Sequence, residues 1–117
     1  MSGVQEAIPL PDEWLDSTDV AAIVGRQVVP EGLGEISLGL MSVAPQKDLP
    51  LVWTVFQNAV DRGSEFVSWI LAIDAVTGQV MVETLGRLYG AMIVPARQRV
   101  HGGTWTDLRP PAWARVR

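Results

Sequence analysis

Apolar and polar residues alternate along much of the chain between residues 35 and 94, and this two-residue period is typical of β-strands. Stretches rich in Gly, Pro, Asp, Asn and Ser interrupt the alternation and predict turns between the strands. Strands are predicted at residues 35–43, 51–57, 65–73 and 79–85, and residues 91–94 are able to add a short further strand.

One of these segments is more apolar than a sheet with one solvated face requires. In residues 51–57 both alternating sets are apolar, which predicts a central strand covered on both faces. Trp53 and Trp69 are expected in the core, because large aromatic side chains dominate small cores. After the third strand, residues 74–78 (DAVTG) predict a tight turn in which the Asp74 carboxylate accepts backbone N–H groups.

A short helix is predicted ahead of the strands. Asp16, Ser17 or Thr18 is suited to cap its N-terminus, and Gly25 or Pro30 ends it. One helical face collects Val20, Ile23, Val24 and Gln27.

These elements predict one α+β domain at residues 1–95, in which one or two short helices pack on an antiparallel sheet of four to five strands. Within it, residues 1–13 are expected to be irregular, because Pro9 and Pro11 lack backbone donors. The triplet Pro-Asp-Glu at 11–13 is able to open one helical turn, ahead of the helix capped at residues 16–18. Residues 96–117 lack a clear period and are expected to form an extended C-terminal arm.

Charge is divided unevenly between the two parts of the chain. The net charge is −4, yet residues 1–86 hold twelve acidic and three basic residues, whereas residues 87–117 hold six arginines and one aspartate. An acidic body with a basic end points to function. It argues against nucleic acid and membrane surfaces as partners, because phosphate would repel the body.

The C-terminal arm is the predicted partner-binding site. It interleaves arginine with tryptophan, the two side chains enriched in binding hot spots, and a Pro-Pro pair favours an extended segment. The arm is expected either to lie over the acidic body or to dock on another protein. The predicted binding residues are Arg97, Arg99, Trp105, Arg109, Trp113, Arg115 and Arg117.

No catalytic constellation is visible in the sequence. Asp74 and Glu83 lie near one hairpin but have no His, Cys or Lys placed to act with them. The chain has no cysteine and one histidine, His101, which is expected to be solvated or bonded to backbone. We therefore expect a protein that is not an enzyme and that binds no cofactor or metal.

The segments VWTV (52–55) and FVSWILAIDAVTGQV (66–80) follow a short helix and bracket an Asp-Ala-x-Thr-Gly turn. This order resembles a PepSY-type domain over about residues 17–85. The resemblance implies a helix-and-sheet fold that is usually extracytoplasmic and linked to the inhibition or regulation of peptidases. The missing signal peptide and the basic arm depart from that pattern. SUKH-type immunity proteins carry a similar strand–turn–glycine signal.

The expected function is that of a small binding or assembly subunit. It would dock on a larger protein complex, or self-associate as a homo-oligomer, through its sheet edge and its basic arm. One alternative is an inhibitor or immunity-like module whose acidic body covers a partner enzyme. Another is a ligand-binding protein or enzyme with a pocket between helix and sheet. The expected compartment is cytoplasmic if the chain is complete and extracytoplasmic if a leader has been removed.

Overall fold

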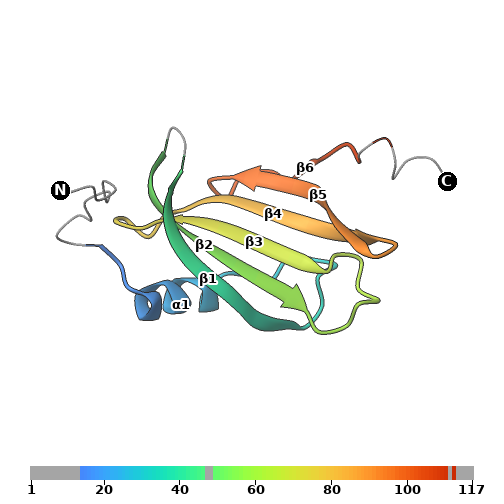
Figure 1. Cartoon of the computed structure of the whole chain (residues 1–117), viewed down its shortest axis with the longest axis horizontal. Coiled ribbons are helices and arrows are strands. Elements are labelled where there is room, and N and C mark those ends of the chain that lie inside the picture. Colours follow the sequence, from blue (N-terminus) through green and yellow to red (C-terminus); the bar gives the residue numbers. More distant parts are fainter. Residues whose placement is uncertain (1–13, 47–48, 111, 113–117) are drawn as a thin grey trace, which may run out of the picture.

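The computed structural model describes residues 14–46, 49–110 and 112 of the 117-residue chain (Figure 1). One helix precedes a series of strands that pair in chain order, so the sheet is an antiparallel meander. The elements are α1 (Ser17–Gly25), β1 (Ile36–Gln46), β2 (Leu49–Ala59), β3 (Ser68–Asp74), β4 (Val80–Tyr89), β5 (Met92–Val100) and β6 (Thr106–Asp107).

The α+β class is confirmed, but the sheet is larger than expected. The described residues form six strands, in the order β1-β2-β3-β4-β5-β6, instead of four or five. Residues 11–13, which were predicted to open a second helix, lie outside the described residues. The described part therefore contains one helix against a sheet that makes up most of the fold.

The helix begins where its capping residues predict. The Asp16 carboxylate accepts from the backbone N–H of Asp19 at 3.0 Å, and Asp19 accepts from that of Asp16 at 3.2 Å, which makes a reciprocal capping box. Val20 and Val24 turn to the core as the spacing predicted. In the part of the chain that the structure describes, no helix is long and apolar enough to cross a membrane.

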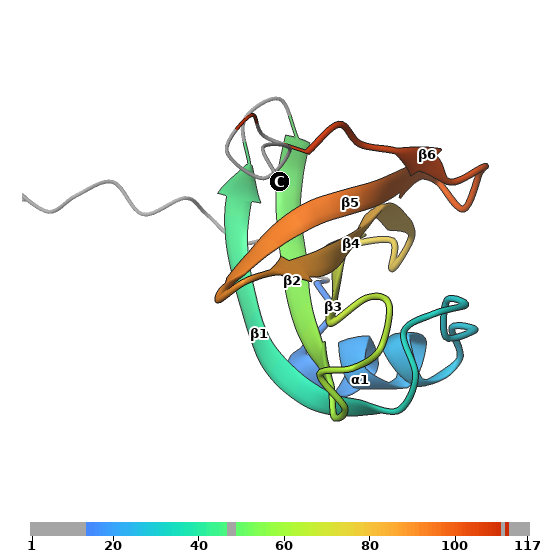
Figure 2. The same cartoon turned by 90° about the vertical axis from the view of Figure 1, so that its right-hand side faces the viewer.

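The core lies between α1 and the concave side of the curved sheet (Figure 2). Trp53 and Trp69 are both buried there, as predicted. The indole N–H of Trp53 donates to the carbonyl of Leu15 at 2.9 Å, and Trp14 stacks on Trp53 with ring centroids 6.0 Å apart. These contacts fix the chain entering α1 on β2. The other buried members of the core are Val20, Val24, Leu33, Val55, Phe66, Leu71, Ile73, Ala75, Leu85 and Ala96.

The expected boundary at residue 95 falls inside a strand. Residues 96–100 are the second half of β5, and they pair with β4 from Leu85↔Arg97 to Val82↔Val100. β6 then pairs with β5 through Asp107 and Thr106. The first half of the expected arm therefore belongs to the sheet. Its residues Arg97, Arg99 and Val100 pair with β4, and the local sequence around them gives no sign of this pairing.

Gly39, in β1, lies too close to the backbone of β2 for any larger residue to fit. The β1–β2 register shifts between Leu38 and Met41, and Gly39 lies inside this irregularity. A Cβ at Gly39 would overlap the backbone carbonyl of Phe56 on β2. Only glycine allows the two strands to approach this closely.

Replacing Gly39 by alanine should therefore separate β1 from β2. We expect Gly39→Ala to lower the free energy of unfolding by about 2 kcal/mol. Gly25→Ala is the matched control, since a Cβ there meets nothing within 4 Å, and it should raise stability by about 0.5 kcal/mol. Urea unfolding followed by tryptophan fluorescence measures both. Equal midpoints for the two variants would contradict the close approach.

Candidate functional site

The structure describes four of the seven predicted binding residues and brings two of them, Arg99 and Trp105, into contact. Arg97 and Arg99 lie on β5, and Trp105 is half-buried and packs against the core. Arg109 is exposed beyond β6. Trp113, Arg115 and Arg117 lie outside the described residues.

Arg99 is held by a carboxylate in the core. Glu83 is 1% exposed, and its two oxygens accept from Arg99 Nε at 2.6 Å and Nη2 at 3.2 Å. Trp69 donates its indole N–H to the same carboxylate at 3.0 Å. On its other side, the Arg99 guanidinium lies 4.5 Å from the centroid of Trp105. One buried carboxylate thus links β3, β4 and β5, and Arg99 extends the link to the segment before β6.

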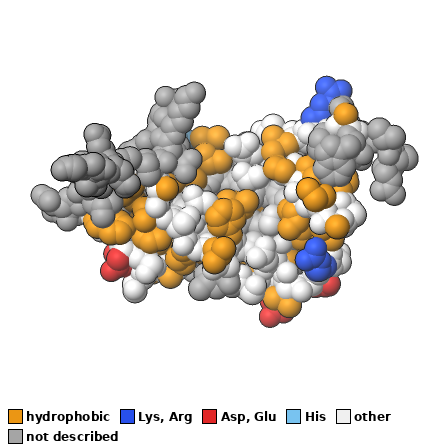
Figure 3. All heavy atoms as spheres, in the orientation of Figure 1, with side chains coloured by type: hydrophobic (Ala, Val, Ile, Leu, Met, Phe, Trp, Pro, Cys, Tyr) orange, Lys and Arg blue, Asp and Glu red, His pale blue; other side chains and the backbone are white. Residues whose placement is uncertain are grey.

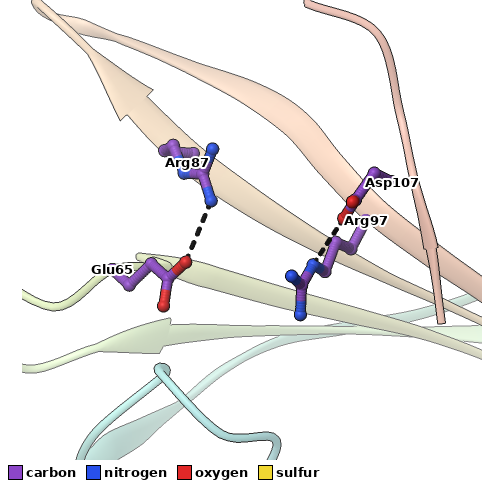
Figure 4. A network of polar contacts seen from close by, with 4 residues as sticks. All are labelled: Glu65, Arg87, Arg97 and Asp107. Atoms are coloured by element: carbon purple, nitrogen blue, oxygen red, sulfur yellow. Dashed lines mark hydrogen bonds and ion pairs between the residues drawn. The ribbon is translucent and has the colours of Figure 1, made fainter.

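Two further arginines flank the buried ring of Phe66. The guanidinium carbons of Arg87 and Arg97 lie 5.1 Å and 5.6 Å from its centroid. Arg87 also pairs with Glu65 at 3.1 Å, and Arg97 pairs with Asp107 at 2.7 Å (Figure 4). Each of these arginines, like Arg99, therefore has a carboxylate partner within the chain. For Arg99 this geometry corresponds to the intramolecular alternative, in which basic residues lie on the acidic body, whereas the carboxylate partner of Arg97 belongs to the C-terminal arm itself.

The opposite side of the sheet faces away from α1 (Figure 2). Directly paired residues share a face, so strand register gives the rows on this side. Phe56, Ile70, Thr84 and Gln98 form one row across β2 to β5. The rows beside it are Thr54, Ala72, Val82 and Val100, and Asn58, Ser68, Gly86 and Pro95. We call these three rows, with Ile93, the open face.

The open face carries no charged residue. Several of its apolar side chains are exposed, Phe56 to 38% and Val100 to 53%. Figure 3, which views the sheet from this side, shows hydrophobic side chains over its middle and charged ones near its rim. An antiparallel sheet with one solvated face ordinarily presents polar side chains there. The open face departs from that rule.

A hollow lies in the open face above Gly86. Its volume is about 120 Å³, and Ser68 and Ile93 close in over Gly86 at one side of it. A Cβ on Gly86 would overlap the hydroxyl of Ser68 and come within 2.8 Å of Ile93. The lining residues are Ser68, Ile70, Thr84, Gly86, Ile93 and Pro95.

Strand β1 forms one edge of the sheet and is also uncharged. Its eleven residues, ISLGLMSVAPQ, include no Asp, Glu, Lys or Arg, and Leu40 is 76% exposed. Edge strands usually carry charges that prevent pairing with other chains. The register shift at Gly39 and the proline at position 45 are the features that interrupt this edge.

Sequence reasoning missed the open face. The expectation that residues 51–57 are covered on both sides holds at Val52, which is completely buried, and is wrong at Phe56, which lies on the same side of the strand and is exposed. The sequence contained one sign of the open face. Both sides of β2 are largely apolar, and the described residues form one short helix, which covers one side of the sheet. Glu83 was likewise assigned no partner, because Arg99 is distant in sequence.

Asp74 and His101 make local contacts. Asp74 Oδ1 accepts from the backbone N–H groups of Val76 at 2.8 Å and Thr77 at 2.9 Å, which confirms the predicted turn. The exposed His101 lies in a turn, with Nδ1 3.1 Å from Gln79 Nε2. Neither residue is joined to a second acid or base by a described hydrogen bond.

No protein-family model, curated protein or solved structure matches the chain. The resemblances to PepSY and SUKH proteins accordingly stay predictions, and the function is argued from the geometry of the described residues.

Removing the cation from the buried pair should strongly destabilise the fold. We expect Arg99→Met to lower the free energy of unfolding by about 3 kcal/mol, because it leaves the Glu83 charge buried beside Trp69 alone. Asp107→Asn is the control. It disrupts the Arg97 ion pair at an exposed carboxylate and should cost less than about 1 kcal/mol. Chemical unfolding of both variants tests this difference, and equal losses would contradict the role of Glu83.

Proposed function

We propose that this protein is a non-catalytic binding subunit that attaches to another protein chain through the open face of its sheet. The observation that carries the proposal is that this face holds no charged side chain and leaves Phe56, Ile93 and Val100 exposed among uncharged polar residues. Contiguous exposed apolar surface rimmed by polar residues is typical of protein–protein interfaces.

The open face is smaller than a standard interface. It covers four strands, β2 to β5, which span roughly 19 Å at about 4.8 Å spacing, and the seven residues of β3 extend roughly 23 Å. This area is roughly half of the roughly 800 Å² that a standard interface buries on each partner. The uncharged β1 edge borders it and supplies backbone donors and acceptors for further pairing.

The surface proposed here differs in part from the one that the sequence predicted. The sheet edge is retained from the sequence prediction, and the open face takes the place of the first half of the arm. Arg97 and Arg99 serve the fold, since their guanidinium groups bind Asp107 and Glu83. Exposed Arg109 remains available to a partner at the rim.

Site-specific photo-crosslinking tests the proposal in cells that make the protein. A benzoylphenylalanine at Phe56 should give a discrete ultraviolet-dependent adduct with a protein, because this side chain would lie inside the interface. The same group at Val28 is the control. Val28 is apolar and 82% exposed but belongs to the loop after α1, so it should give no such adduct. Absence of an adduct from Phe56, or equal adducts from both positions, would refute docking through the open face.

A further inference from the structure

The geometry points to a second copy of this chain as the occupant of the open face. We infer a two-fold dimer in which Phe56 of each copy enters the hollow above Gly86 of the other. This inference rests on the proposed function, because it names the partner for the same surface.

The first argument is that the open face carries both a knob and a hole. Phe56 on β2 is a large side chain that stays 38% exposed in the middle row. The hollow at Gly86 is uncharged and holds about 120 Å³. An apolar cavity of roughly 150 Å³ accepts a benzene molecule, so the hollow is of the size of an aromatic ring. Its lining includes the apolar residues Ile70, Ile93 and Pro95 and the methyl-bearing Thr84.

The second argument is the position of the two features. In a two-fold interface residue i contacts residue j and j contacts i, so a self-complementary face needs a knob and a hole side by side. Gly86, one of the residues that line the hollow, lies two strands across and one row along from Phe56, which is about 12 Å at ordinary spacings. A two-fold axis passing between them places each knob over the partner's hole. The open face is the convex side of the curved sheet, so the two copies touch around this axis.

The third argument is electrostatic. Two copies with a net charge of −4 repel one another wherever their acidic surfaces meet. The open face has no charged side chain, so identical faces meet without like charges in opposition. A different protein would gain no charge complementarity from this face, whereas complementary charge is how partners are ordinarily selected.

The experiment is the solution mass of the full chain, measured by light scattering from micromolar to millimolar concentration. We expect the mass to rise from 12.7 kDa to twice that value. Phe56→Ala should weaken dimerisation by roughly a hundredfold, because both copies lose an aromatic side chain from the interface core. Thr84→Phe should also block it, since it fills the hole in both copies.

Mixing the two variants separates this geometry from a loss of folding. Phe56→Ala lacks the knob but keeps the hole, and Thr84→Phe keeps the knob but fills the hole. Their mixture should form a heterodimer, in which one knob enters one open hole and the filled hole faces the missing ring. Val28→Ala is the control that removes exposed apolar surface elsewhere, and it should dimerise like the parent chain.

Three results would overturn the inference: a monomer at all concentrations, a dimer unaffected by Phe56→Ala, or two monomeric variants that fail to combine. A monomer that still forms an adduct with a different protein at position 56 would leave the proposed function intact and remove only the second copy as partner. Failure of both experiments would remove the open face as an interface.

Discussion

One nine-residue helix accompanies a six-stranded sheet, and this shortage of helix decides how the rest of the molecule is built. At 1.5 Å per residue α1 is roughly 13 Å long. The sheet is roughly 29 Å wide at ordinary strand spacing. The helix therefore places Val20 and Val24 in the core but cannot shield the whole concave side. The remaining apolar side chains are covered by loops, by the long stems of charged residues, or by nothing in the described chain.

Arginine side chains cover the concave side where the helix does not reach. Arg87 and Arg97 flank Phe66, which is completely buried although it lies in a loop. Arg99 lies over Trp105 and reaches the buried Glu83. An arginine has an apolar stem that packs on a ring and a guanidinium that needs a carboxylate nearby. This explains why the basic end of the sequence and its acidic body form one structure, with the ion pairs joining them.

Much of this fold follows from local sequence, and its remainder depends on contacts between distant residues. The capping box at Asp16, the turn at Asp74 and the alternation in β2 and β3 are local, and each was predictable. The sequence predicts a strand only at residues 91–94, whereas β5 runs from Met92 to Val100, because Pro95 and the following arginines do not suggest a strand. Their partners, Glu83 and Asp107, are separated from them by ten or more positions. The hollow at Gly86 depends on neighbours from β3 and β5, so a glycine in the sequence gives no sign of it.

The uncharged open face has a consequence for stability as well as for binding. On a solvated sheet, the exposed parts of Phe56, Ile93 and Val100 gain little from folding, because they remain in water. When a partner covers them, their burial stabilises the folded state and has no counterpart in the unfolded chain. Folding and association are then linked, so that the apparent stability rises with the concentration of the partner. For a chain with so little helix to complete its core, the second layer that the sheet lacks would come from the assembly.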